Sequence, residues 1–316
     1  MRGFTVGSRE SALALWQTNW VVARLKALYP DSTYRIVPIK TQGDKILDVP
    51  LAKIGDKGLF VKEIENALLA GEIDLAVHSS KDLPTELPQA LTIGAFCIRE
   101  DPRDVFIGKA GSLAQIREGG RIGTSSLRRR SQLLALRPDL EIVDIRGNVE
   151  TRIRKIEEVG LDGTILAAAG VRRLEKTGEI GFYFSSEELV PAVGQGAIAI
   201  ELRRDDAITR QLIRPQHDEV TAAAVRAERA LMKWLEGGCQ VPIGAHAVVD
   251  EGGLRMDAYL GSLDGTRYVR DSIEGPASSA EELGETLAER MHNNGGGEIL
   301  AGVRGAHEGE GTGYWT

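Results

Sequence analysis

Three consecutive arginines, Arg128–Arg130, follow Ser125 and Ser126, either of which suits the N-cap position of a helix beginning at Leu127. The arginines then occupy the first turn of that helix, where the dipole is already positive and each exposed cation costs about 0.3–1 kcal/mol. A bound anion would offset this conflict, because helix N-termini and guanidinium groups both favour anions. The alternative is a solvated basic face or pairing with nearby acids, which we favour for Arg130 alone.

Two further arginines, Arg146 and Arg173, follow strands that we predict beside the first one. Together with Arg128 and Arg129 they favour a carboxylate or phosphate site, because the planar guanidinium fork suits both anions. No G-x-x-x-x-G-K-[ST] sequence is present, and no G-x-G-x-x-G sequence follows a strand. The pattern therefore predicts a site for several carboxylates.

The dipeptide Lys81-Asp82 lies in "VHSSKDLP", which follows another predicted strand. A surface ion pair worth about 0–1 kcal/mol is the simple alternative. An aspartate among arginines has a distinct use, because it can hold a cationic or N–H-bearing part of a ligand and exchange protons with it. We therefore predict a site role for this dipeptide, and a packing or turn role for His78.

The two cysteines have different surroundings. Cys97 lies in the apolar, strand-like run "LTIGAFCI", which predicts a small core residue. Cys239 lies in "EGGCQVPIGAH", where two glycines and a Val-Pro pair indicate a turn. The absence of a Cys-x-x-Cys motif and of a His/Cys cluster predicts neither a disulfide framework nor a metal site. These residues alone leave open what Cys239 is bonded to.

The elements that position these residues alternate between strand and helix. The first hundred residues predict strands at "FTVGS", "YRIVPIK" and "IDLAVHS", separated by helices. After Pro102 the alternation of strand and helix begins again, with predicted strands at "GRIGTSS", "EIVDI" and "GTILAAAG". Each half is typical of a βαβαβ unit, so we predict mostly parallel, doubly wound sheets with a ligand crevice beyond the carboxyl ends of their strands.

Residues 219–316 follow a different pattern. A long helix at "EVTAAAVRAERALMKWLE", antiparallel-looking strands and a helix at "SAEELGETLAERMH" predict a smaller α+β domain. The last dozen residues are Gly-rich and aperiodic, which predicts a loose tail.

The bulk properties narrow the class of protein. At 316 residues, 42% hydrophobic and 27% charged, the chain fits two or three globular domains. A net charge of −7 disfavours a nucleic-acid binder, although residues 121–176 carry 12 Lys+Arg against 8 Asp+Glu. No apolar stretch approaches the roughly 18 residues of a membrane helix, and no leader sequence is evident, so we expect a cytoplasmic protein.

Ten segments, taken in order, resemble the porphobilinogen deaminase family, also called hydroxymethylbilane synthases. The resemblance covers roughly residues 4–302 and rests on "GSRESALALWQ", "KTQGD", "KGLFVKEIE", "AVHSSKDLP", "REDPRDVFI", "GTSSLRR", "RGNVETR", "LAAAGVRRL", "LVPAVGQGAIAIE" and "LEGGCQVPIGA". Each motif alone is weak, whereas the ordered set that ends in the GGC-x-x-P loop is highly specific.

The resemblance implies an answer for Cys239. In this family the cysteine of that loop carries a dipyrromethane cofactor through a thioether, and the enzyme assembles the cofactor itself. The family reaction joins four porphobilinogen molecules head to tail, releases ammonia each time, and frees linear hydroxymethylbilane by hydrolysis. Porphobilinogen carries acetate and propionate groups, so a cluster of arginines is the expected complement.

The resemblance also implies roles for individual residues. Asp82 would be the catalytic aspartate that binds pyrrole N–H groups and stabilises the positive charge left when ammonia departs. Lys53, Lys57 and Phe60 would belong to a loop that covers the site. The residues that would contact the acid groups of cofactor or substrate, or line the site beside them, are Arg9, Ser11, Gln17, Ser79, Lys81, Thr124, Ser126, Arg128, Arg129, Arg146, Arg152, Arg173 and Gln195.

The implied fold is two periplasmic-binding-protein-like α/β domains joined by hinges, with a smaller α+β C-terminal domain. The expected division is domain 1 at 1–98 and 196–216, domain 2 at 99–195, domain 3 at 217–303 and a flexible tail at 304–316. The family default is a monomer. The competing class is a two-lobed anion receptor without chemistry, which would need neither Asp82 among arginines nor the glycine-flanked Cys239.

Overall fold

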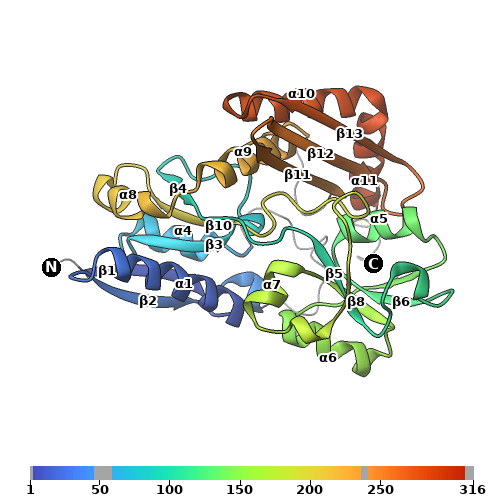
Figure 1. Cartoon of the computed structure of the whole chain (residues 1–316), viewed down its shortest axis with the longest axis horizontal. Helices are drawn as coiled ribbons and strands as arrows, with labels where there is room; N and C mark the ends of the chain where they lie inside the picture. The colour runs from blue at the N-terminus through green and yellow to red at the C-terminus, as the bar shows by residue number, and fades with distance from the viewer. Residues whose placement is uncertain (1–2, 46–58, 236–240, 310–316) are drawn as a thin grey trace, which may run out of the picture.

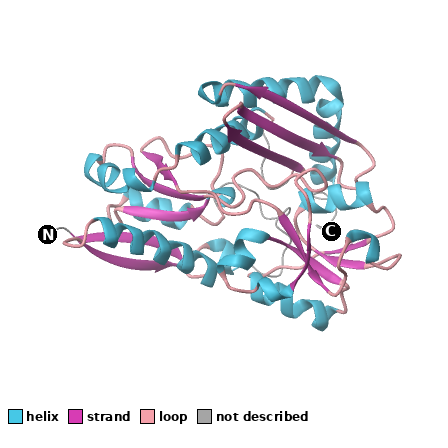
Figure 2. Cartoon of the chain, viewed as in Figure 1, coloured by secondary structure: helices cyan, strands magenta, loops and turns pink. Residues whose placement is uncertain are grey.

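The computed structural model describes residues 3–45, 59–235 and 241–309 of the chain. Figure 1 shows three sheets, with the blue-to-cyan sheet and the green sheet side by side and the orange-red sheet packed above them. Helices lie against each sheet and loops connect them (Figure 2). The predicted fold class, two α/β units and a smaller α+β unit, is confirmed.

The first sheet has the strand order β2-β1-β3-β10-β4. Strands β1, β2 and β3 are parallel, whereas β10 is antiparallel to both β3 and β4. The yellow strand β10 lies within the cyan sheet in Figure 1, because the chain returns to this sheet late in the sequence. The strands are β1 (Gly3–Arg9), β2 (Thr33–Ile39), β3 (Leu75–Ser79), β4 (Leu91–Phe96) and β10 (Ile198–Arg203).

The second sheet repeats this plan with the order β7-β6-β8-β5-β9. Here β6, β7 and β8 are parallel, and β5 is antiparallel to both β8 and β9. The antiparallel strand in each sheet is the one that the chain enters directly after crossing from the other sheet. The strands are β5 (Asp104–Gly108), β6 (Arg121–Gly123), β7 (Glu141–Val143), β8 (Gly163–Ala167) and β9 (Ile180–Tyr183).

The helices follow the expected local signals. Ser11, Ser126, Asn148, Asp206 and Asp218 each accept a backbone N–H from the first turn, as N-cap residues do. The helices of the two α/β units are α1 (Ala12–Leu28), α2 (Gln42–Lys45), α4 (Lys62–Leu69), α5 (Leu127–Leu136), α6 (Val149–Val159), α7 (Ala168–Arg173) and α8 (Ala207–Ile213), and a short 3₁₀ turn η1 covers Ser80–Asp82.

The third sheet is a fully antiparallel meander, β11-β12-β13, covered by helices on one face. Alternate residues of the strands, such as Ala245, Met256 and Leu260, pack with Leu231 and Leu287 of the helices into one buried core. The elements are α9 (Glu219–Trp234), β11 (Ile243–Asp250), β12 (Gly253–Gly261), β13 (Tyr268–Gly275), α10 (Ala280–Met291) and α11 (Gly297–Gly309).

Each α/β sheet also receives one antiparallel strand after a crossing between sheets, a detail that the alternation of strands and helices does not predict. The predicted tail needs correction. Residues 304–309 are helical, since α11 continues through them to Gly309, where the glycine content predicted irregular structure. The remaining residues of the predicted tail, 310–316, lie outside the described residues.

Glu228 on α9 holds the two crossings and the third sheet together. Its side chain is fully buried and forms a two-point ion pair with Arg99, at 2.6 and 3.2 Å, in the first crossing. The backbone N–H of Gly194, in the second crossing, donates to the same carboxylate at 2.7 Å, and that of Ala247 on β11 donates at 2.8 Å. One carboxylate therefore fixes three segments that are far apart in the sequence.

We expect Glu228→Gln to lower the free energy of unfolding by about 3–5 kcal/mol, because it leaves the Arg99 guanidinium buried without its counter-charge. Denaturant titration followed by circular dichroism measures this change. The matched control is Glu158→Gln, which removes an exposed Arg154–Glu158 pair on α6 and should cost no more than about 0.5 kcal/mol. Equal losses in the two variants would contradict the role assigned to Glu228.

Candidate active site

A cavity of about 2010 Å³ lies where all three units meet. This volume is well above the roughly 300–1,000 Å³ of ordinary small-molecule sites, so it has room for a ligand larger than one small molecule. Most residues predicted for the site line it, namely Arg9, Ser11, Gln17, Phe60, Ser79, Lys81, Asp82, Arg129, Arg146, Arg152 and Arg173.

Asp82 lies at the end of the 3₁₀ turn that follows β3, where the carboxyl end of the strand opens onto the cavity. Arg9, at the end of the neighbouring strand β1, places Nη1 3.6 Å from Asp82 Oδ2. The guanidinium of Arg9 also lies 4.4 Å from the centre of the Phe60 ring, a cation–π distance. Two adjacent strand ends thus place an anion, a cation and an aromatic ring together, and Asp82 remains partly exposed to the cavity.

The other cations of the wall are crowded, and Lys81, Arg146 and Arg152 are half-buried. Burial and the charge of Arg129 lower the pKa of Lys81 to about 8, against the opposing effect of Asp82. Burial, followed by the charges of Arg129 and Arg146, lowers the pKa of Arg152 to about 10. Burial alone lowers the pKa of Arg146. Carboxylates that bind here would relieve this mutual repulsion.

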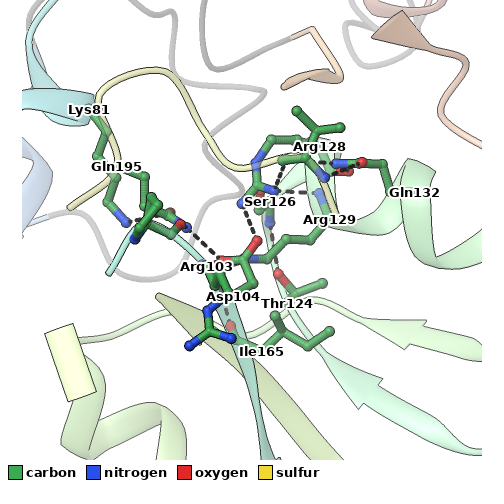
Figure 3. A network of polar contacts seen from close by, with 12 residues as sticks. Lys81, Arg103, Asp104, Thr124, Ser126, Arg128, Arg129, Gln132, Ile165 and Gln195 are labelled. Atoms are coloured by element: carbon green, nitrogen blue, oxygen red, sulfur yellow. Dashed lines mark hydrogen bonds and ion pairs between the residues drawn. The ribbon is translucent and has the colours of Figure 1, made fainter. Parts of the chain in front are cut away.

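Asp104, the first residue of β5, is the buried counter-charge of this wall (Figure 3). Its Oδ2 accepts from Arg128 Nη2 at 2.7 Å, and its Oδ1 accepts from Arg129 Nη2 at 2.7 Å. Burial by itself would raise the pKa of Asp104, but the two arginines overcome it and hold that pKa far below its usual range. The carboxylate is therefore ionised at neutral pH.

Gln195 carries the network from Asp104 to Lys81 (Figure 3). Its Nε2 donates to Asp104 Oδ1 at 2.9 Å, and its Oε1 accepts from Lys81 Nζ at 3.3 Å. Gly194 and Gly196 on either side have positive φ values of 70° and 90°, which favour glycine. A Cβ at Gly196 would also collide with the carbonyl oxygen of Glu100. The two glycines of the "GQG" sequence therefore hold the side-chain amide of Gln195 between the two α/β units.

The remaining predicted residues shape the wall by hydrogen bonding. Arg173 Nη2 donates to the Gly196 carbonyl at 2.7 Å, and burial lowers the pKa of Arg173. Arg152 Nε donates to the Gly147 carbonyl at 2.9 Å. The side chains of Gln17 and Ser79 are joined by a hydrogen bond of 2.8 Å.

Four predicted residues lie behind the wall and do not line the cavity, namely Thr124, Ser126, Arg128 and Gln195. Arg128 is buried, with Nη1 donating to the Val190 carbonyl at 2.7 Å and Nη2 to Asp104. Thr124 Oγ1 accepts the backbone N–H of Ser126, and Ser126 in turn caps α5. In this structure these residues position their neighbours instead of facing a ligand.

Three predicted residues, Lys53, Lys57 and Cys239, lie outside the described residues. The other cysteine, Cys97, is fully buried, and burial raises the pKa of its thiol to about 12, which confirms the predicted core role. His78 is buried too, with Nε2 3.0 Å from Glu201 Oε2. No group of His, Cys, Asp and Glu suited to a metal ion occurs within the described ranges.

Sequence reasoning missed Asp104 and Glu228. Asp104 belongs to "REDPRDVFI", where three acids and two arginines fall within six residues. Nothing local separates the fully buried acid from the two half-buried ones. Glu228 is one of several charged residues on α9, and charged residues on a helix usually indicate a solvent-exposed face. A signal was present only for Glu228, since it lies on the side of α9 that carries Ala224, Ala227 and Leu231.

Comparison with known proteins identifies the family. The family model "Porphobilinogen deaminase, dipyromethane cofactor binding domain" matches residues 4–211, and "Porphobilinogen deaminase, C-terminal domain" matches residues 222–293. The chain belongs to the porphobilinogen deaminase family. The porphobilinogen deaminase of Carboxydothermus hydrogenoformans is 54% identical over 300 residues, covering 95% of this chain and 96% of the relative. That of Geobacter sulfurreducens is 54% identical over 298 residues, covering 94% of each chain.

Solved structures give weaker likenesses. The methionine binding protein MetQ aligns at a TM-score of 0.43 and 14% identity, covering 66% of this chain and 87% of that one. The periplasmic aliphatic sulphonate binding protein SsuA of Escherichia coli aligns at 0.39 and 15% identity, covering 73% and 70%. At these scores neither likeness bears on the function of this porphobilinogen deaminase family member.

The Asp104–Gln195–Lys81 network generates a prediction about charge. We expect Asp104→Asn to lower the pKa of Lys81 below its value of about 8, because the carboxylate of Asp104 favours the charged ammonium. The pH dependence of Lys81 acetylation, read by peptide mass spectrometry, reports that pKa. The matched control is Asp139→Asn, which removes an exposed pair with Arg137. It should leave the midpoint of the pH profile of Lys81 acetylation unchanged. An unmoved midpoint in Asp104→Asn would refute the coupling.

Proposed function

We propose that this chain acts as a hydroxymethylbilane synthase, with Asp82 as its catalytic group and the surrounding cations as its carboxylate-binding wall. The observation that carries the proposal is the cluster of four cations around one partly exposed aspartate. Arg129 is buried, and Lys81, Arg146 and Arg152 are half-buried. Porphobilinogen presents acid groups together with a pyrrole N–H and an amine. A wall of cations interrupted by one accessible carboxylate is complementary to that combination.

The cationic wall also suits the dipyrromethane cofactor of this family. Two linked pyrroles bear acid side chains. Burial, and after it repulsion by neighbouring arginines, lowers the pKa values of Lys81 and Arg152, and such acid groups would offset both effects. When bound, the cofactor supplies the pyrrole carbon to which the first substrate is joined. The residues of the chain bind the acid groups of both the cofactor and the substrate and hold the two reacting pyrrole rings in the correct relative orientation.

Asp82 accepts hydrogen bonds from pyrrole N–H groups and stabilises positive charge that develops as ammonia leaves. It is suited to this role because its carboxylate reaches the cavity, while Arg9 at 3.6 Å holds its orientation. Electrostatic stabilisation is strongest where water is excluded, and the large cavity becomes drier as a ligand fills it. Phe60 beside Arg9 adds an apolar surface for a pyrrole ring.

The proposal includes Cys239 as the thioether attachment site. Cys97 is unsuited to that role, because its thiol is fully buried and its raised pKa keeps it protonated at neutral pH. Cys239 follows α9 and precedes β11, between Leu235 and Val241, and Val241 lines the cavity. The position of Val241 in the cavity lining, two residues after Cys239, supports this attachment.

We extend the proposal to the domain boundaries, the oligomeric state and the cellular location of the protein. The chain would divide into domain 1 (1–98 and 196–216), domain 2 (99–195) and domain 3 (217–303). The crossing strands β5 and β10 support the discontinuous first domain. Within the described residues no helix is both long and apolar enough to cross a membrane. From the family resemblance we expect a cytoplasmic monomer that binds no nucleic acid.

Intact-mass measurement tests the cofactor and its attachment. We expect the purified parent to exceed its polypeptide mass by two linked pyrroles, and Cys239→Ser to show the bare mass, because only Cys239 offers a thiol for the thioether. Cys97→Ser, as the control, should retain the excess. A parent at bare mass that stays unchanged after incubation with porphobilinogen would refute the enzyme proposal and favour the anion receptor.

Replacement of the catalytic carboxylate tests the assigned chemistry. We expect Asp82→Asn to lower kcat by about 10²–10³, with a much smaller change in KM, because a neutral amide cannot stabilise the developing positive charge. Steady-state formation of hydroxymethylbilane at saturating porphobilinogen gives kcat. Glu86→Gln, which changes an exposed acid at the edge of the same cavity, should stay near the parent. A kcat within threefold of the parent for Asp82→Asn would remove Asp82 from the catalytic role.

A further inference from the structure

Glu65 on α4 is an anion in an otherwise cationic wall. The acidic residues of the described chain that line the cavity are Glu10, Glu65, Asp82, Glu86 and Glu150. Glu10, Glu86 and Glu150 are exposed, and Asp82 is paired with Arg9. Glu65 alone among these five is buried, with 8% of its surface exposed.

Oε1 of the Glu65 carboxylate has no hydrogen-bond partner among the described residues and is fully shielded from solvent. Burial of an unpaired carboxylate is costly, so an isolated one calls for a cation or a proton. Burial and the nearby charge of Glu201 both raise the pKa of Glu65. A cation bound beside Glu65 would offset both effects and favour its ionised form.

The surroundings of Glu65 reinforce its negative character. Helix α4 packs against β1, β3, β4 and β10. Strand β10 contributes Glu201, which is fully buried and whose Oε1 is also unpartnered among the described residues. It also contributes Arg203, which donates to the Leu68 carbonyl of α4 and is paired with Asp74 and Asp206. Strand β3 contributes His78, bound to the other oxygen of Glu201 and lowering the pKa of Glu65. Strand β4 has no charged residue, and Arg9 at the end of β1 is engaged by Asp82.

We infer that Glu65 binds the primary ammonium group of the incoming substrate, the group that leaves as ammonia, an inference that rests on the proposed function. A substrate that carries both carboxylates and an ammonium group needs both positive and negative groups in its binding site. The arginines and Lys81 supply the positive side. Glu65 supplies the negative side, within the same cavity as Asp82, and Glu201 behind it strengthens the local negative potential.

Glu65→Gln, which preserves shape and removes the charge, tests the inference. We expect KM for porphobilinogen to rise about 10- to 100-fold at pH 8, the size of a lost charge-assisted contact, while kcat changes less than about threefold. In the parent, KM should rise as the pH falls through the pKa of Glu65, because protonation removes the anion. That rise should be absent in Glu65→Gln. The matched control, Glu72→Gln, alters an exposed acid just beyond the same helix and should keep both the KM and its pH profile.

Two further measurements separate binding of the amine from a structural role. A competitive inhibitor with a methyl group in place of the amine should bind the parent and Glu65→Gln equally. Glu65→Gln should unfold at the same or a higher temperature than the parent, because a neutral amide replaces an unpaired buried carboxylate with a raised pKa. A large loss of stability, or equal losses for amine and methyl ligands, would overturn the inference.

Failure of this inference is distinguishable from failure of the proposed function. A parent that turns over porphobilinogen, together with a Glu65→Gln variant of unchanged KM and pH profile, would overturn the ammonium site alone. A parent that carries no cofactor and gives no turnover would overturn the proposed function and this inference with it.

Discussion

The cationic wall depends on a single buried carboxylate. Several guanidinium groups held together away from water repel one another, and such an arrangement persists only with a counter-charge in good geometry. Asp104 provides it by accepting 2.7 Å hydrogen bonds from both Arg128 and Arg129. Because Gln195 links the same carboxylate to Lys81, the position and charge of a lysine on the opposite sheet depend on it too.

The topology explains why this carboxylate can serve both sheets. Asp104 begins β5 directly after the first crossing, and Gln195 lies in the second crossing shortly before β10. Glu228 ties both crossings to the third sheet through Arg99 and the backbone of Gly194. The crossings are therefore held by buried polar contacts, and they lead directly into β5 and β10.

The parts of the fold and the site that could be predicted are those with local causes. Strand ends and N-caps depend on neighbouring residues, so the sequence located Ser126 at the N-cap of α5 and Arg146 shortly after β7. Arg173 instead ends helix α7, where the sequence predicted the end of a strand. The direction of β5 and β10 could not be predicted, because pairing partners far along the chain determine it. The same holds for adjacent arginines: Arg129 lines the cavity and Arg128 does not, a difference that only tertiary packing creates.

The lowered pKa values of Lys81 and Arg152 show that the site holds unfavourable electrostatic energy before any ligand binds. Acid groups of a ligand lower that electrostatic energy when they bind. The same fixed cations therefore provide both the affinity for the ligand and the preorganisation of the site. Each added monomer brings more carboxylates to a wall whose cations are fixed in number. We therefore expect the electrostatic gain to fall with each addition, because later acid groups meet cations that are already neutralised. A charge balance of this kind favours release of a finished chain over unlimited growth.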